Sequence, residues 1–196
     1  MWSKKGYSGE STGVEELIDS ALGIPAIVAG SGRGVFEEVG QAQSDLGRFI
    51  VFACNDVSVF VPRLDHMVSL HTPKLAMWAY LRRDPTSKGY GNKDFRVHDA
   101  GLYGVELWHQ WKGLKPLMAL SGLFAAQIAY LLGCDPIVLC GVPCDNTPTF
   151  WQLDGFDNPH YAKHSRMLLD ECDRVPEFRR SLRSMSGLSQ MWLGKL

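Results

Sequence analysis

The chain has 196 residues, of which 45% are hydrophobic, so it is long and apolar enough for one globular domain with a substantial core. Its formal net charge of -1 excludes the basic surface with which proteins bind nucleic acid irrespective of sequence. Its apolar runs are shorter than the roughly 18 residues of a membrane-spanning helix, and its five cysteines lack Cys-x-x-Cys spacing. We therefore expect a single cytoplasmic domain over 1–196, with reduced cysteines and without a metal site or membrane span.

The first half of the chain alternates predicted strands and helices. A short apolar run at 24–29 ends in glycines, and apolar residues at helical spacing follow it. Runs rich in β-formers predict further strands at 48–54 and 66–70, and a helix follows over 74–83. Glycine, charged and turn residues dominate 84–101, which favours a mobile active-site flap. Residues 1–20 are expected to be peripheral.

The second half contains the clearest helix and strand. Ser121 is expected to cap a helix over 122–132 that Gly133 ends, and the apolar run 136–140 predicts a buried strand. An amphipathic helix over 162–172 and a last strand at 182–185 follow, and the aromatic-rich segment 142–164 is expected to form a lid-like loop. The alternation predicts a single Rossmann-like α/β domain, whose mostly parallel sheet carries helices on both faces.

Candidate ligand-binding residues follow the predicted strands, because ligands bind at the carboxyl ends of parallel strands. Gly30, Ser31 and Gly32 form a turn that can direct backbone amides at an anion, with Arg33 adding a charge. A plain strand-to-helix turn explains the same residues about equally well. Asn55, directly after the second strand, can hydrogen-bond a base or a sugar, although asparagine is also a common helix cap.

The start of the helix over 122–132 offers a second group of binding residues. Ser121 and Gly122 present a hydroxyl and helix-start amides to a phosphate or carboxylate, and a simple N-cap is the alternative. The G-x-S-x-G setting of a hydrolase nucleophile is lacking, so Ser121 is assigned to binding rather than to attack. Cys144 and Asp145 follow the strand at 136–140 and should lie near the cleft.

Two histidines and a tyrosine precede the predicted helix over 162–172. His160 and His164 are four residues apart, a spacing that suits a metal on a helix, but Pro159 disfavours helix here and no third ligand is obvious. Since imidazole is the usual proton carrier near neutral pH, we assign an acid/base role to one of them, with Tyr161 as a supporting phenol or packing residue. The other histidines, at 66, 71, 98 and 109, are taken as surface or core residues.

The order of these motifs resembles that of a known family. The motifs are Gly-Ser-Gly at 30–32, Phe-Ala-Cys-Asn at 52–55, Leu-Ser-Gly at 120–122, Leu-Gly at 132–133, Leu-Cys-Gly at 139–141 and His-Tyr-Ala-Lys-His-Ser at 160–165. Their order and spacing resemble the bacterial sialyltransferases of glycosyltransferase family 42 and the related domain of the archaeal 6-hydroxymethylpterin diphosphokinase. Two segments depart from the family pattern: 30–34 is Gly-Ser-Gly-Arg-Gly rather than G-N-G-P-S, and 141–145 is Gly-Val-Pro-Cys-Asp rather than G-I-D-F-Y.

The resemblance implies a Rossmann-like enzyme that binds a CMP-sugar, inverts its anomeric carbon and needs no metal or other cofactor. It implies that the turn at 30–32 and Asn55 hold the nucleotide, that Ser121 and Gly122 contact its phosphate or the sugar carboxylate, and that His164 is the general base. Two alternatives remain open: diphosphokinase-like transfer of pyrophosphate from ATP, and a catalytically silent nucleotide-binding module. The expected partner is a small nucleotide sugar, and six tryptophans allow an apolar interface in a homo-oligomer.

Overall fold

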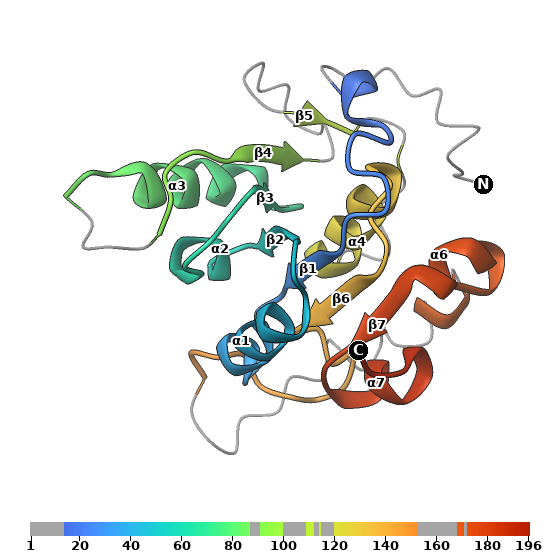
Figure 1. Ribbon diagram of the computed structural model, residues 1–196. Coiled ribbons are helices and arrows are strands. Elements are labelled where there is room, and N and C mark those ends of the chain that lie inside the picture. Colours follow the sequence, from blue (N-terminus) through green and yellow to red (C-terminus); the bar gives the residue numbers. More distant parts are fainter. Residues whose placement is uncertain are drawn as a thin grey trace.

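A seven-stranded, entirely parallel sheet organises the chain (Figure 1). The computed structural model describes residues 14–86, 91–99, 109–111, 114, 120–152, 168–170 and 172–196. The strands lie in the order β5-β4-β3-β2-β1-β6-β7. Their bounds are β1 (Ala26–Ala29), β2 (Ile50–Cys54), β3 (His66–Val68), β4 (Arg96–Asp99), β5 (His109–Gln110), β6 (Ile137–Cys140) and β7 (Leu182–Ser184).

Helices cover both faces of this sheet (Figure 1). One face carries α1 (Val35–Asp45), α2 (Val57–Phe60) and α3 (Thr72–Arg83). The opposite face carries the 3-10 helix η1 (Glu15–Leu17), α4 (Ser121–Leu131), α6 (Pro176–Ser181) and α7 (Gly187–Leu193). Successive side chains of a strand point to opposite faces, so Val28 packs with α4 and Ile27 packs with α1. The two faces therefore have separate apolar cores, and the predicted α/β fold is confirmed.

The α4 helix is the most deeply buried element among the described helices. It contacts β1, β2, β3 and β6, and both sides of it are apolar, from Leu123 and Phe124 to Leu131. Gly133, with a φ of 91°, follows as the predicted end of the helix. Because α4 is fixed against four strands, its first turn has a defined position at one edge of the sheet.

The order in which successive strands join the sheet reverses at β1. From β1 to β5 each new strand is added on one side, whereas β6 and β7 pair on the other side of β1. The carboxyl ends of β1 and β6 therefore lie side by side at a topological switch point. Open parallel sheets bind their ligands at this position, because the loops leaving the two strands diverge there.

Several sequence predictions need correction. The segment 84–101, expected to be a flap, contributes strand β4 to the sheet, while 87–90 and 100–101 lie outside the described residues. Val14 and Leu17, expected to be peripheral, are buried in the core on the α4 side. Of the helix predicted over 162–172, residues 168–170 and 172 are helical and the others lie outside the described part. None of the described helices is long and apolar enough to cross a membrane.

Candidate functional site

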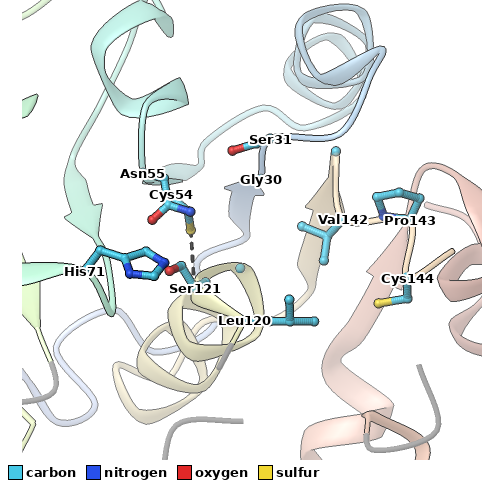
Figure 2. Close-up of a pocket in the computed structure, with 12 residues that line it drawn as sticks. Gly30, Ser31, Cys54, Asn55, His71, Leu120, Ser121, Val142, Pro143 and Cys144 are labelled. Carbon is cyan, nitrogen blue, oxygen red and sulfur yellow. Dashed lines mark hydrogen bonds between the residues drawn. The ribbon is translucent and has the colours of Figure 1, made fainter. Parts of the chain in front are cut away.

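A cavity of about 130 Å³ opens at the switch point, beside the carboxyl ends of β1, β2 and β6 (Figure 2). Six of the residues predicted to lie at the site or near the cleft line it: Gly30, Ser31, Asn55, Ser121, Gly122 and Cys144. They come from four separate stretches of the chain, which the parallel sheet brings to one edge. Gly32 adjoins the cavity through the same turn without lining it.

The glycines at the switch point allow the ends of β1 and β6 to approach closely. The Gly30 amide donates to the Cys140 carbonyl at 2.7 Å, and the Gly32 amide donates to the Gly141 carbonyl at 2.8 Å. A Cβ atom on Gly30 would lie 2.6 Å from both the Gly141 oxygen and Cγ2 of Val142. Neighbouring protein atoms therefore leave no room for a side chain at the glycine positions of this turn. This close packing explains the Gly-Ser-Gly turn without a ligand.

This packing corrects the expected role of the turn. The amides of Gly30 and Gly32 are engaged by β6 and its following residue, and the Arg33 amide donates to the Pro148 carbonyl at 2.8 Å. Contrary to the prediction, these three amides donate to carbonyl groups of the protein and not to an anion. The Arg33 side chain donates to the carbonyl of Gln152, so its guanidinium binds the 142–152 segment.

Asn55 contributes a hydrogen-bond donor to the cavity. It adopts a left-handed conformation with a φ of 56°, which asparagine tolerates better than most residues. The Ser69 hydroxyl donates to its Oδ1 at 2.7 Å and accepts the His71 amide at 2.9 Å. With Oδ1 engaged by Ser69, the Nδ2 amino group is what Asn55 can offer to a ligand.

The first turn of α4 forms another wall of the cavity. Leu120, rather than Ser121, is the N-cap residue, and no side chain among the described residues caps this end. The Ser121 hydroxyl instead accepts the Leu70 amide at 3.3 Å, and the Cys54 thiol donates to the Ser121 carbonyl at 3.3 Å. The predicted capping role of Ser121 is therefore wrong. Its place at the cavity supports the binding alternative, because uncapped helix-start amides favour negative charge.

His71 is a cavity residue that the sequence reasoning did not select. It precedes α3 as its N-cap residue, and Figure 2 shows its imidazole reaching towards Ser121. The rule that selected Asn55, directly after the strand predicted at 48–54, applies equally to His71, which directly follows the run predicted as a strand at 66–70. An imidazole here can donate to a ligand or carry a proton.

Among its described residues, the cavity lining contains no Asp, Glu, Lys or Arg. Burial raises the pKa of Cys54 far above its usual value, and burial and Asp145 raise that of Cys144 to about 12. Both thiols are therefore protonated at neutral pH and are poor nucleophiles. The cavity is formally uncharged and offers mainly donors: the Asn55 amino group, the α4 amides and His71. This arrangement suits an anionic ligand that also carries hydroxyl or carbonyl groups.

Two acidic residues near the cavity have structural roles. Asp145, predicted as a supporting site residue, accepts the amides of Thr147 at 2.8 Å and Leu188 at 3.3 Å, so it ties the loop after β6 to α7. Glu38 accepts the Gly141 amide at 2.8 Å, which fixes the peptide that follows β6. Burial raises the pKa of Glu38, and this hydrogen bond opposes the rise.

The catalytic assignment falls outside the part of the chain that the structure describes. His160, Tyr161 and His164 all belong to the undescribed stretch 153–167. Of the segment expected to be a lid, 142–152 is described: its first residues line the cavity, and Thr149 pairs with Gly32. Within the described residues, no group of three or more His, Cys, Asp and Glu side chains could hold a metal ion.

Comparison with solved structures finds a similar fold in the MAf glycosyltransferase from Magnetospirillum magneticum AMB-1. The fold is shared with a glycosyltransferase. The TM-score is 0.55 and the sequence identity 13%, over 94% of this chain and 35% of the MAf chain. At this identity the likeness shows the fold alone, and the chain spans about a third of the length of MAf. No family model and no curated protein matches the sequence.

The likeness to MAf bears on the resemblance drawn from the sequence. It supports a glycosyltransferase-like fold, as expected, and it does not distinguish the family 42 sialyltransferases from the diphosphokinase-related domain. The choice between these chemistries depends on the cavity itself.

Proposed function

We propose that the chain is a glycosyltransferase that binds a nucleotide sugar in the switch-point cavity. The observation that carries the proposal is the combination of an uncapped α4 start with an uncharged, donor-rich lining. A phosphate group linked to a sugar and a base needs such donors, and helix N-termini are common phosphate sites. The MAf likeness supports the same class of enzyme, because the shared fold includes nearly the whole of this chain.

The proposed donor lies with its phosphate against the amides of Ser121 and Gly122. The Asn55 amino group then hydrogen-bonds the nucleotide, and the sugar lies towards the ends of β1 and β6. The identity of the nucleotide as CMP, and of the sugar as a sialic acid, rests on the resemblance to family 42. No metal takes part in this proposal, since the α4 amides supply partial positive charge and His71 can supply a hydrogen-bond donor beside the leaving phosphate.

The proposed reaction is an inverting displacement at the anomeric carbon. The acceptor hydroxyl oxygen bonds to that carbon while the bond from the carbon to the phosphate oxygen breaks, and CMP leaves with the bonding electrons. His164 takes the proton of the acceptor hydroxyl as general base. An imidazole suits this role because it accepts a proton near neutral pH.

Replacing His164 with glutamine is expected to lower turnover about 100-fold, a typical contribution of a general base, and to leave CMP affinity unchanged. The measurement is the rate of CMP release from a CMP-linked sialic acid, with a chelator present, together with calorimetric binding of CMP. His160→Gln is the matched control, four residues earlier in the same segment.

Three results would contradict the proposal in different ways. Hydrolysis or transfer that requires Mg²⁺ and ATP would favour the diphosphokinase-like alternative. CMP binding without turnover in the unsubstituted protein would favour a silent nucleotide-binding module. An equal loss of activity in both histidine variants would remove His164 from the role of base.

A further inference from the structure

Aromatic side chains are exposed beside the cavity. Phe150 lies between Phe36 and Phe60, with ring centroids 5.4 Å and 5.9 Å away, in edge-to-face arrangements. Phe36 and Phe60 are 38% and 40% exposed, and Trp151, the next residue after Phe150, is 62% exposed. We call these four residues the aromatic rim. Clustered exposed aromatic residues of this kind mark binding surfaces more often than single exposed apolar residues do.

The aromatic rim is attached to the cavity through Ser31. The Phe150 amide donates to the Ser31 carbonyl at 2.9 Å, and the Ser31 hydroxyl donates to Asp56 at 2.9 Å. Asp56 is the N-cap residue of α2, the helix that ends at Phe60. Ser31 itself lines the cavity. Hydrogen bonds of one cavity residue, Ser31, therefore hold both Phe150 and the N-cap of the helix that carries Phe60.

We propose that the aromatic rim is the acceptor subsite and that it holds a neutral sugar ring of the acceptor. This inference rests on the proposed function, which requires a second substrate beside the donor. Figure 2 shows Ser31 and Ser121 on separate sides of the cavity. In the proposed orientation the phosphate of the donor lies at Ser121 and its sugar lies towards β1, so an acceptor held on the rim would reach the anomeric carbon from the side of Ser31.

The chemistry of the rim fits a sugar ring better than a charged acceptor. Aromatic faces carry partial negative charge, and the axial C–H groups of a pyranose are weakly positive and apolar, so the two surfaces stack. Arg33, two residues after Ser31, donates its guanidinium to the Gln152 carbonyl. The equatorial hydroxyl groups of a stacked sugar remain at its edge, where one of them can meet the anomeric carbon of the donor.

The test measures binding of neutral sugars to the whole chain by saturation-transfer NMR, with a panel of hexoses, N-acetylhexosamines and lactose. Phe36→Ala and Trp151→Ala are each expected to weaken binding of the recognised sugar about tenfold, since an aromatic contact of this kind contributes roughly that factor. CMP affinity, measured by calorimetry on the same samples, is expected to stay unchanged. Tyr80→Ala is the control, because Tyr80 is a 70% exposed aromatic residue on α3.

The outcomes separate this inference from the proposed function. CMP binding with no sugar binding, or sugar binding unaffected by the rim variants, would overturn the acceptor subsite and leave the donor site standing. Weaker CMP binding in the rim variants would assign the rim to the nucleotide base instead. A change of oligomeric state in those variants, without a change in sugar binding, would make the rim an interface between copies. Absence of CMP binding would count against the proposed function alone.

Discussion

Replacing Arg82 with methionine is expected to destabilise the fold by about 4 kcal/mol, the loss typical of a buried polar network left without its donors. Arg82 on α3 is fully buried. Its Nη1 donates to the carbonyls of Ser58 and Val61 at 2.8 Å and of Val59 at 3.3 Å. Its Nε and Nη2 donate to the carbonyl and side chain of Asn92 at 3.1 Å. One guanidinium thus satisfies the end of α2 and the segment before β4.

Methionine approximates the length of the arginine chain but donates no hydrogen bond. The carbonyls at the end of α2 would remain buried without partners, each at a cost of roughly 1–3 kcal/mol. Burial lowers the pKa of Arg82 to about 10, so the guanidinium is still charged at neutral pH and its hydrogen bonds are charge-assisted. Because the N-cap of α2, Asp56, accepts a hydrogen bond from the cavity residue Ser31, loosening of α2 would reach the cavity.

The measurement is chemical denaturation of Arg82→Met beside Arg83→Met. Arg83 is the neighbouring residue, is exposed, and contacts the ring and carbonyl of Phe95. The Arg83 variant is expected to lose about 1 kcal/mol or less, as exposed substitutions usually do. Equal losses in the two variants would show that the Arg82 network contributes little.

A steep loss of stability on acidification is the second large effect that we expect. Four aromatic rings stack across β2, β3, β4 and β5: Phe52, His66, His98 and His109, with centroids 4.4 to 5.0 Å apart. Nothing in their spacing groups these histidines, which lie up to 43 positions apart. The parallel register pairs their strands and places the rings on the α4 side of the sheet.

Hydrogen bonds fix the buried histidines in the neutral form. The Trp111 indole can only donate, and it donates to Nδ1 of His98 at 3.1 Å. The proton of His98 is therefore on Nε2, which donates to Nδ1 of His66 at 2.7 Å. Burial lowers the pKa of His66 to about 3, helped by Arg96 and His109, and burial also lowers the pKa of His98 well below its usual value.

The sign of the effect follows from proton uptake on unfolding. Between pH 6.5 and about 3 the unfolded chain binds a proton at His66 that the folded chain does not bind. Stability is therefore retained above pH 6.5 and falls as the pH decreases through this window. At about 1.4 kcal/mol per pH unit, His66 alone removes about 2 kcal/mol by pH 5. Glu38, with its raised pKa, contributes with the opposite sign.

Denaturation of His66→Gln and of the unsubstituted protein between pH 7.5 and 5 measures this contribution. Glutamine can still accept from His98 but does not titrate, so the variant should lose about 2 kcal/mol less than the unsubstituted protein over this range. The Glu38 contribution is common to both proteins and cancels in the difference. His71→Gln is the control, because His71 is exposed. Parallel pH profiles for His66→Gln and the unsubstituted protein would refute the neutral network.

The sequence predicted the strands whose burial comes from apolar side chains. The runs at 24–29, 48–54 and 136–140 became β1, β2 and β6, because Val, Ile, Leu and Phe dominate them. Strand β4 was missed, since its buried residues include His98 and Asp99. A polar side chain can occupy a core only when partners satisfy it, and the partners of His98 lie on β3 and just after β5. Because these partners are distant in the sequence, no periodic pattern of apolar residues marks β4 as a buried strand.

The position of the site could be predicted from the sequence where the end of a strand could be predicted. Gly30 and Asn55 meet because parallel strands end at one edge, and Ser121 joins them because α4, which leads to β6, begins at that edge; neither rule needs knowledge of side-chain contacts. The role of Gly30 was not predictable, because its neighbour Val142 comes from a distant part of the chain. His71 directly follows the run at 66–70, so the same rule could have selected it, but it was taken as a surface or core residue.

Calorimetric titration of the protein with CMP, in the presence of a chelator, tests the proposed donor site most directly. One CMP per chain is expected to bind, and Asn55→Gly is expected to weaken binding about tenfold through the lost hydrogen bond, because glycine keeps the left-handed backbone at this position. Asn146→Gly, at an exposed asparagine outside the cavity, is expected to bind CMP normally. Absence of CMP binding, or equal affinity in the Asn55 variant, would contradict a nucleotide-sugar site at the β1–β6 switch point.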